Sequence, residues 1–553
     1  MPVSSESNGA GAGRTRVVDY IVEHLARRRV NHVFGVDGAN IEDLYDAAYA
    51  CPDITAVVAK HEFSAAAMAD AYSRAEGGIG VVVATSGGGA LNTIPGLGES
   101  FASRVPVLAL IGQPPTSADG HGSFQDTSGR GGALDGEALF AAVSVFCRRV
   151  LTPADIMTAL PEALAAAAHL GGPAVLLLPK DIQQASVEVG SPDLADEPPR
   201  RVGDIAALAE LLRGVEGPVT IIAGDQVARD DARTELENLR AVLRAGIAAV
   251  PDAKDVAPEA LGVAGVMGHP AVGVALANSA ACLLVGTRLP LMARAGLDLE
   301  RLPVGSIGSA PPYVPATHVE SDDLRAALNL LADALAGDVE RPEPIADVSR
   351  GELAPPRHAG PGVRYREAML ALDELLPAGT DIVVDAGNVG AAAIHWLPAR
   401  RDGRFLVALG MGGMGYSFGA GIGMTFARGR RTVVIAGDGS FFMHGMDIHT
   451  ALHHRLPVTF VLFDNHAHAM CVTREQMFYG DRYSYNRFGP SRLGAGLAAM
   501  FPALPSTDVT DIGDLGVAIK AALDADGPSV VAVECSADEI PPFTAFLDQK
   551  DNR

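Results

Sequence analysis

The chain alternates short apolar runs with longer amphipathic segments from end to end. Runs such as ITAVVA (54–59), GIGVVVAT (78–85) and VPVLALIG (105–112) have the length and the β-branched content of buried strands. Each enters a polar or glycine-rich turn, and a segment with helical spacing follows. This alternation predicts parallel strands joined by crossover helices, so the expected fold class is α/β.

The strand-like runs fall into three blocks, and loose stretches rich in proline separate them. The first block covers residues 14–185, the second 203–340 and the third 364–545. Residues 1–13 are small and polar and are predicted to form a disordered lead. We therefore expect three doubly wound domains with mostly parallel sheets, which suits a chain of 553 residues that exceeds the capacity of one hydrophobic core.

Charge and cysteine usage narrow the functional classes. The net charge of -23 argues against nonspecific binding to nucleic acid or to an anionic membrane surface. No apolar run reaches the roughly 18 residues that a membrane span needs. The five cysteines are scattered without CxxC or metal-ligand spacing, which favours a reducing compartment. We expect a cytoplasmic protein that acts on small molecules.

One stretch of the third block places polar side chains after two neighbouring strands. RTVVIA and PVTFVLF are predicted strands on either side of a helix-like segment, FFMHGMDIHTALHH; Asp438 and Asn465 lie just past them. In a right-handed βαβ unit the carboxyl ends of the two strands meet, so folding brings these residues together. Carboxylate, amide and backbone oxygens suit octahedral Mg²⁺, which usually completes its shell with a diphosphate. Gly437 and Gly439 would let the backbone approach that diphosphate.

This stretch resembles the motif of the thiamine-diphosphate enzymes, which begins Gly-Asp-Gly and ends in Asn-Asn; here the end is Asp464-Asn465. In the first block, KHEFSAAAMADAYSRAEGGIGVVVATSGGGALN is similar to the pyrimidine-domain signature of that family. Gly88 stands where its acetolactate-synthase branch commonly has proline. In the third block, GMGGMGYSFGAGIG is similar to the stretch whose methionine supports the bent cofactor. The resemblance covers the whole chain in the order pyrimidine, central and diphosphate domains.

The resemblance implies thiamine diphosphate and Mg²⁺ as cofactors. The metal ligands would be Asp438, Asn465 and the main-chain carbonyl of Ala467. The implied cofactor contacts are Glu62, Asn388, Gly412, Met414, Gly437, Asp438, Gly439, Ser440, Asn465, His468, Ala469 and Met470. The cofactor works through a carbanion at its thiazolium C2, which adds to a carbonyl and then serves as an electron sink. Glu62 would favour the imino tautomer whose nitrogen removes the C2 proton, and Met414 would hold the two rings in a V.

The substrate side of the site departs from the decarboxylases of the family. Those enzymes carry a histidine pair where this chain has Gln125 and Asp126, preceded by Phe124. His121 lies nearby and stays a candidate acid or base. A Phe-Gln pair followed by an acid resembles the acetolactate-synthase and benzaldehyde-lyase sites. A glutamine can hydrogen-bond a carbonyl without readily delivering protons.

A second departure lies after the metal motif. Cys471 occupies the place of the catalytic glutamate of the decarboxylases, and Thr473-Arg474 replaces the Gln-Trp pair of the acetohydroxyacid synthases. Arg474 would favour an acceptor with anionic or sugar-like oxygens. We therefore expect a carboligase or lyase that acts on a 2-oxo acid, with pyruvate as the expected donor, and transfers the acyl carbanion equivalent to a second carbonyl compound.

Three alternatives stay open: a 2-oxo acid decarboxylase that releases aldehyde, a flavin-linked 2-oxo acid oxidase, and a catalytically silent homologue. FAD is possible in the central block but cannot be assigned, because GPVTIIAGDQ contains no clean GxGxxG. In this family the pyrimidine domain of one subunit meets the diphosphate domain of another. The resemblance therefore implies a homodimer or homotetramer with active sites at the subunit interface.

Overall fold

The protein is described by a computed structural model that covers residues 13–76, 78–189, 200–258, 261–337 and 349–547. The predicted lead, residues 1–13, lies outside these ranges except for Gly13, which begins the first strand. Within the described residues, no helix combines the length and the apolar character that crossing a bilayer would require.

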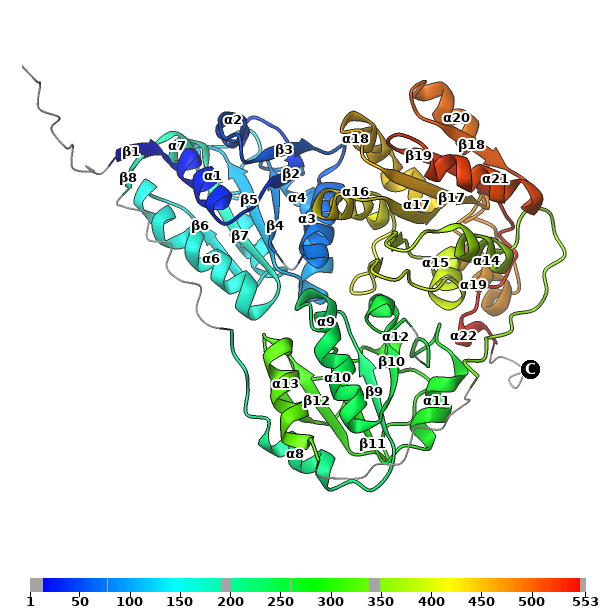
Figure 1. The fold of residues 1–553 in the computed structure, drawn as a ribbon. Helices are drawn as coiled ribbons and strands as arrows, with labels where there is room; N and C mark the ends of the chain where they lie inside the picture. Colours follow the sequence, from blue (N-terminus) through cyan, green and yellow to red (C-terminus); the bar gives the residue numbers. More distant parts are fainter. Residues whose placement is uncertain (1–12, 77, 190–199, 259–260, 338–348, 548–553) are drawn as a thin grey trace, which may run out of the picture. The chain divides into compact units, whose positions relative to one another are not determined.

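Three parallel sheets form the framework, and they confirm the α/β prediction (Figure 1). The first has the strand order β3-β2-β4-β5-β7-β6, and a short antiparallel pair of β1 and β8 lies beside it. The strands of the sheet and of the pair are β1 Gly13–Arg16, β2 His32–Val36, β3 Thr55–Val58, β4 Gly80–Ala84, β5 Val107–Gln113, β6 Phe146–Arg149, β7 Pro173–Pro179 and β8 Ser186–Val189. Its helices are α1 Val17–Arg27, α2 Glu42–Ala50, α3 Glu62–Glu76, α4 Gly88–Ala102, α5 Gly136–Ala141, α6 Ile156–Leu170 and α7 Lys180–Gln184.

Burial was predicted wrongly for the strand in ITAVVA. In β3 only Val57 is buried, whereas Thr55 and Val58 are exposed. The reason is its position, because β3 pairs with β2 alone and forms the edge of the sheet. β4, β5 and β7 lie inside the sheet and are buried along their whole length.

The second sheet has five strands in the order β10-β9-β11-β12-β13, all parallel. They are β9 Val219–Ala223, β10 Gly246–Ala249, β11 Ala281–Val285, β12 Val304–Gly308 and β13 Thr317–Glu320. The accompanying helices are α8 Ala206–Arg213, α9 Gln226–Arg229, α10 Arg233–Leu243, α11 Pro270–Ala277, α12 Leu291–Arg294 and α13 Leu324–Leu335, and a 3₁₀ segment, η3, spans Pro251–Val256.

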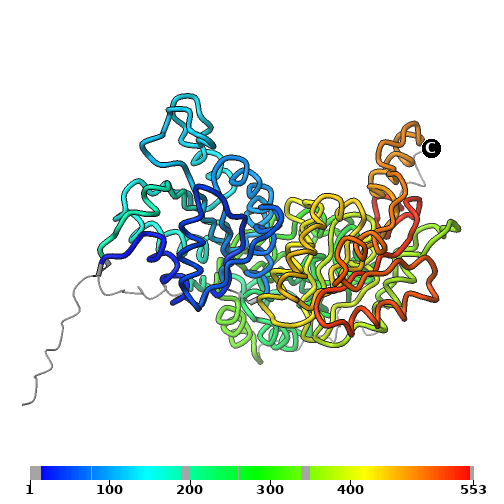
Figure 2. Tube along the Cα trace, turned by 90° about the horizontal axis from the view of Figure 1, so that it is seen from above, coloured from blue at the N-terminus to red at the C-terminus, as the bar shows by residue number. Residues whose placement is uncertain are grey.

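The third sheet has six parallel strands in the order β15-β14-β16-β17-β19-β18. They are β14 Asp381–Val384, β15 Phe405–Val407, β16 Thr432–Gly437, β17 Val458–Asp464, β18 Ser506–Val509 and β19 Ser529–Glu534. The helices are α14 Tyr365–Leu375, α15 Asn388–Trp396, α16 Tyr416–Arg428, α17 Asp438–His444, α18 Ile448–His453, α19 Ala469–Tyr479, α20 Leu493–Met500, α21 Ile512–Leu523 and α22 Thr544–Leu547. β18 is an edge strand, and with α20, in orange, it lies at the margin of this part in both views (Figures 1 and 2).

The helix predicted between β16 and β17 is broken in two. α17 ends at His444, a 3₁₀ turn covers Gly445–Asp447, and α18 begins at Ile448. A Cβ at Gly445 would lie 2.2 Å from the ring of Phe441, so the ring fits only because this position lacks a side chain. The crossover is otherwise as expected, since β16 and β17 are adjacent parallel strands.

The described residues form two compact units. The first runs to Ala69 and resumes at Ile79, and the second holds Asp70–Gly78 together with the chain from Arg200 onward. The three sheets fall within the predicted ranges 14–185, 203–340 and 364–545. As exact domain boundaries, those ranges stay predictions.

Within the second unit, a buried ion cluster joins the second and third sheets. Arg404, which precedes β15, is 2% exposed. Its Nη2 donates to Asp225 Oδ1 at 2.8 Å, and its Nε lies 2.9 Å from Asp255 Oδ2. Both aspartates follow strands of the second sheet. Two carboxylates buried at this junction need a cation, because an unpaired buried charge is strongly unfavourable.

We expect Arg404→Met to lower the free energy of unfolding by about 3–5 kcal/mol, because it removes a buried cation from a cluster in which Asp225 keeps Arg229 and Asp255 keeps Arg233. Arg455→Met removes the exposed pair with Asp526 and should cost less than about 1 kcal/mol. Urea unfolding followed by circular dichroism would measure both. Equal losses in the two variants would contradict the role given to Arg404.

Candidate active site

A pocket opens at the carboxyl ends of β16 and β17, where the sequence predicts the site. It is lined by Ala386, Gly387, Asn388, Val389, Met414, Gly437, Asp438, Gly439, Ser440, Asn465, Ala467, His468, Ala469, Met470 and Cys471. Asp438 is the first residue of α17, and Asn465 follows β17 directly. The crossover therefore brings together two residues that are far apart in the sequence. Most of the predicted cofactor contacts lie on this pocket, whereas Gly412 is not among its lining residues.

The pocket contains buried oxygen atoms without a hydrogen-bond donor. Among the described residues these include Asp438 Oδ1, Asn465 Oδ1 and Asn388 Oδ1. The second oxygen of Asp438 accepts from the backbone N–H of Ala467 at 3.1 Å. Burial, followed by the charge of Asp464, raises the pKa of Asp438 to about 7. A cation at these oxygens would offset both effects.

A carboxylate that the sequence analysis did not select also lies here. Ligand atoms of Asp438, Asp464 and His466 all lie within 4.8 Å of one another, an arrangement that could hold a metal ion. Asp464 already accepts from Ser491 Oγ at 3.1 and 2.9 Å, and His466 bridges Asp464 and Glu534 at 3.0 Å each. Asp438 Oδ1 and Asn465 Oδ1 have no hydrogen-bond donor, so these two atoms are the better ligands for a hard cation.

Tyr365 orients the amide of Asn465. The Nδ2 group of Asn465 donates to the Tyr365 hydroxyl at 3.4 Å, which leaves Oδ1 for the pocket. Tyr365 is fully buried in α14, and the carboxylate of Glu539 accepts from its backbone N–H at 3.0 and 3.2 Å. The sequence analysis missed Tyr365 because it lies 100 residues before Asn465.

Asp385 is a second missed residue, and its carboxylate joins three segments of the site. It accepts from the backbone N–H of Gly415 at 3.0 and 3.1 Å and from that of Ser417 at 2.9 Å. It also accepts from Ser440 Oγ at 2.6 Å. Asp385 thus ties the end of β14 to the loop that carries Met414 and to the start of α17. In the sequence, only its position directly after the strand-like run DIVV indicated that Asp385 would lie at the carboxyl edge of the sheet.

The glycines of the Gly-Asp-Gly stretch differ in their surroundings. A Cβ at Gly439 would lie 2.5 Å from His468 Nδ1 and 3.3 Å from Met414 Cε, so no side chain fits there. A Cβ at Gly437 would meet only the Phe463 carbonyl, at 3.9 Å. The space beside Gly437 is therefore open to a ligand.

Glu62 lies in the first unit, at the first turn of α3. Its Oε2 accepts from Asn92 Nδ2 at 3.0 Å. A Cβ at Gly89 would lie 2.9 Å from Glu62 Oε1, so the carboxylate packs closely against the start of α4. Asn92 ends the TSGGGALN stretch and is the partner of Glu62 that sequence reasoning did not single out.

The predicted substrate loop of the first unit carries Gln125 in a left-handed conformation, with a φ of 62°. Gln125 Oε1 accepts from Ser86 Oγ at 3.1 Å, and Gly87 is so close that a Cβ there would lie 2.7 Å from the Gln125 side chain. Asp126 accepts from the backbone N–H groups of Ser128 and Gly120, so it stabilises the loop itself. Phe124 and His121 are exposed.

The predicted substrate residues of the second unit lie on the first turns of α19. Ala469 and Met470 line the pocket with Cys471, which is exposed. Arg474 is exposed and is not among the lining residues. Thr473 is buried, and its Oγ1 accepts from Asn388 Nδ2 at 3.4 Å. The inner face of α19 thus supports Asn388, while Arg474 lies on the outer face.

Two segments of the chain match known protein families. Residues 15–131 match the N-terminal binding domain of the thiamine pyrophosphate enzymes, and residues 385–533 match their C-terminal binding domain. The chain belongs to the thiamine-diphosphate enzyme family.

Several relatives align with most of this chain. A probable acetolactate synthase large subunit of Methanocaldococcus jannaschii is 28% identical over 521 residues, which is 85% of this chain and 84% of the relative. The acetolactate synthase isozyme 2 large subunit of Escherichia coli is 27% identical over 94% of this chain and 95% of its own. A sulfoacetaldehyde acetyltransferase of Castellaniella defragrans is 26% identical over 94% of this chain and 93% of its own.

The residues of the pocket fit the metal and diphosphate end of thiamine diphosphate. Asp438 Oδ1 and Asn465 Oδ1 are buried acceptors without donors, as ligands of Mg²⁺ should be. When bound, the cofactor supplies a nucleophilic carbon and an electron sink. Asp438 would hold the metal, Tyr365 would keep the Asn465 oxygen directed at it, and Met414 lies beside Gly439. Glu62 would share a proton with the aminopyrimidine ring.

We expect Tyr365→Phe to weaken Mg²⁺ binding by about tenfold, because the Asn465 amide loses the partner that fixes its orientation. Mg²⁺ titration calorimetry at saturating thiamine diphosphate would measure the change. Tyr20→Phe is the matched control, since Tyr20 is also a buried tyrosine but lies in α1 of the other unit. Unchanged Mg²⁺ affinity in Tyr365→Phe, or an equal loss in both variants, would contradict this role.

Proposed function

We propose that the enzyme is a thiamine-diphosphate- and Mg²⁺-dependent carboligase. It takes a 2-oxo acid, with pyruvate as the expected donor, and joins the acyl carbon to the carbonyl carbon of a second compound. In the overall reaction the carboxylate of the donor leaves as CO₂, and one proton is taken up to give the 2-hydroxy ketone. The names of its relatives, a synthase and an acetyltransferase, support transfer over simple decarboxylation.

The observation that carries this proposal is the combination of intact cofactor groups with the absence of the decarboxylases' acids at two predicted substrate positions. Asp438 and Asn465 retain acceptors for a metal, and Glu62 retains a close partner. At the two positions where the decarboxylases have acids, this chain has Gln125, which Ser86 holds through its oxygen, and Cys471, which lines the pocket. Without a fast proton donor, attack on a second carbonyl becomes the favoured outcome.

The alternatives make different predictions about products. A decarboxylase would release free aldehyde, and a flavin-linked oxidase would bind FAD and absorb in the visible range. A silent homologue would bind the cofactor without turnover. The retained set of Glu62, Met414, Asp438 and Asn465 favours an active enzyme. Arg474 remains our candidate for selecting an acceptor, although its exposure on α19 means that another part of the assembly would have to bring that acceptor to it.

The decisive assay incubates the protein with thiamine diphosphate, Mg²⁺ and ¹³C-labelled pyruvate, with and without an aldehyde or a second 2-oxo acid, and follows the products by NMR. We expect acetoin- or acetolactate-type products and little free acetaldehyde. Acetaldehyde as the main product would support the decarboxylase reading. If the cofactor binds but pyruvate is not consumed, a panel of 2-oxo acids would distinguish another donor from a silent protein.

Replacing Cys471 by glutamate should shift part of the reaction from carboligation to the release of free aldehyde. We expect Cys471→Glu to raise the share of free aldehyde several-fold, because it adds an acid to the pocket wall. Cys471→Gln has the same shape without the acid and should leave the product ratio near that of the wild type. An unchanged ratio in both variants would show that the missing acid does not decide the outcome.

We also propose a homodimer or homotetramer whose active sites combine Glu62 of one subunit with Asp438 of another. Glu62→Gln and Asp438→Ala chains should each be inactive alone. Mixed after subunit exchange, they should recover about a quarter of the wild-type activity, since half of the dimers are mixed and each of those has one intact site. No recovery despite demonstrated exchange would exclude shared sites.

A further inference from the structure

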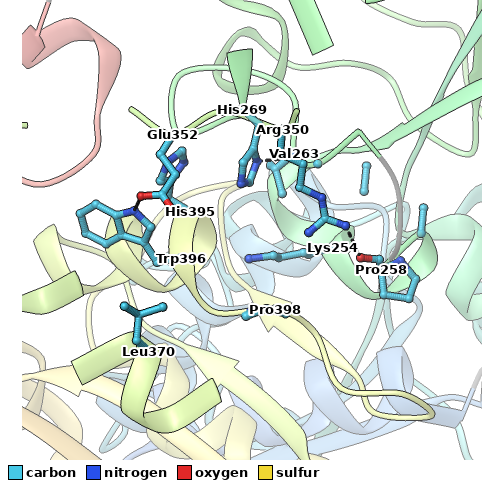
Figure 3. A pocket seen from close by; sticks show the side chains of 14 residues that line it. Lys254, Pro258, Val263, His269, Arg350, Glu352, Leu370, His395, Trp396 and Pro398 are labelled. Carbon is cyan, nitrogen blue, oxygen red and sulfur yellow. Dashed lines mark hydrogen bonds between the residues drawn. The ribbon is translucent and has the colours of Figure 1, made fainter. Parts of the chain in front are cut away.

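Two cavities of the second unit differ in how their polar groups are satisfied. One lies between the loop after β10 and the carboxyl end of α15 (Figure 3), and none of its described lining residues has a buried side-chain nitrogen or oxygen without a hydrogen-bond partner. There Lys254 donates to the Ile394 carbonyl at 2.5 Å, and Trp396 Nε1 donates to Glu352 at 3.1 Å. The candidate active-site pocket differs, because several of its buried oxygen atoms have no donor.

Asn388 supplies one of these oxygen atoms. It is the first residue of α15, lines the pocket and is 3% exposed. Its Oδ1 has no hydrogen-bond donor among the described residues, and neither has Oδ1 of Asp438 or of Asn465 in the same pocket. An amide oxygen buried without a donor is unfavourable, so its place in a pocket points to a bound ligand.

Two acceptors fix the orientation of the Asn388 amide. Its Nδ2 donates to the Glu539 carbonyl at 3.3 Å and to Thr473 Oγ1 at 3.4 Å. The Thr473 hydroxyl gives its own proton to the Ala469 carbonyl, one turn earlier in α19, at 3.0 Å. Neither partner can therefore donate to Asn388. A reversed amide would place its oxygen against two acceptors, so Oδ1 is the atom left for the pocket.

Glu539 supports both amides of the pocket. Its backbone carbonyl accepts from Asn388, and its carboxylate accepts from the backbone N–H of Tyr365 at 3.0 and 3.2 Å. The Tyr365 hydroxyl in turn accepts from Asn465 Nδ2 at 3.4 Å. Both Nδ2 groups are thus held by the protein, and both Oδ1 atoms are left without a donor. This shared arrangement indicates that the two amides serve the same ligand.

The unpartnered oxygen limits what that ligand can present to Asn388. An amide oxygen accepts hydrogen bonds or binds a cation, and it cannot donate. The oxygen atoms of a diphosphate are acceptors as well, so they would repel it. Mg²⁺ gives up water reluctantly and usually keeps several water ligands, and the cation makes the protons of those waters stronger donors. A metal-bound water therefore matches Asn388 Oδ1, whereas a phosphate oxygen does not.

We propose that Asn388 Oδ1 accepts a hydrogen bond from a water bound to the metal of the active-site pocket. Thr473 and Glu539 are the positioning residues that turn this oxygen toward the pocket. The contact deepens the proposed function, on whose metal site it rests, and it can be measured without turnover. It adds an outer partner to the direct metal ligands, Asp438 and Asn465.

Mn²⁺ serves as the probe for this contact. The full-length protein at saturating thiamine diphosphate, without any 2-oxo acid, is titrated with Mn²⁺, and free Mn²⁺ is followed by electron paramagnetic resonance. We expect Asn388→Leu to raise the Mn²⁺ dissociation constant about tenfold, because the bound water loses its acceptor. Asn388→Asp also loses Nδ2 but keeps an oxygen toward the pocket, so it should bind Mn²⁺ at least as tightly as the wild type.

A pair of threonine variants tests the orientation of Asn388. Thr473→Val keeps the shape of the side chain but removes one of the two acceptors of Asn388 Nδ2, and it should raise the dissociation constant about threefold. Thr425→Val is the matched control. Thr425 is also buried and donates to the carbonyl four residues earlier, that of Gly421, at 2.8 Å, but it does not line the pocket. Thermal unfolding verifies that each variant is folded, and the threonine pair decides if Asn388→Leu is not.

Several results would overturn the proposal. Equal weakening in Asn388→Leu and Asn388→Asp would show that only the Nδ2 contacts matter. Unchanged Mn²⁺ affinity in Asn388→Leu or in Thr473→Val would show that the oxygen or its orientation is not used, and a wild type that binds no Mn²⁺ would remove the site. The expected Mn²⁺ results without any carboligation product would support this contact and contradict only the proposed reaction.

Discussion

The structure depends on one constraint, the burial of oxygen acceptors at the carboxyl edge of the third sheet. Parallel strands place the ends of β16 and β17 side by side, and the chain uses that geometry to bring Asp438 and Asn465 together. Both are buried, and each has an oxygen without a donor. Unsatisfied buried acceptors of this kind are costly, and a cation bound between them would offset that cost and link folding to metal binding.

Buried polar groups with compensating partners also connect the second and third sheets. The segment η3, Pro251–Val256, sends Asp255 toward Arg404 and Lys254 toward the carbonyls at the end of α15. Asp255 thus pairs with a cation of the third sheet, while the neighbouring Lys254 donates to backbone carbonyls of the same part of the chain. If apolar side chains surrounded these residues, their charges would be buried without partners. Each ionisable residue here therefore lies beside a group that compensates it.

The sequence was sufficient for the parts of the fold that follow from local pattern. Strand runs and crossovers predicted the α/β class, and the Gly-Asp-Gly stretch placed Asp438 and Asn465 after adjacent strands. It was insufficient where a residue acts through a distant partner. Tyr365, Asp385 and Asn92 carry no motif of their own, and their roles arise from contacts made only after folding. The exposure of β3 is another such case, because strand order decides which run lies at an edge.

Asp385 shows how these contacts are organised. One carboxylate accepts from Gly415, Ser417 and Ser440, so the loop after β15 and the start of α17 share a single anchor at the end of β14. These segments order together, since movement of the Asp385 carboxylate would leave donors unsatisfied in all of them. The cofactor end of this site therefore assembles as one cooperative unit, and hydrogen exchange in these three segments should report a single opening event.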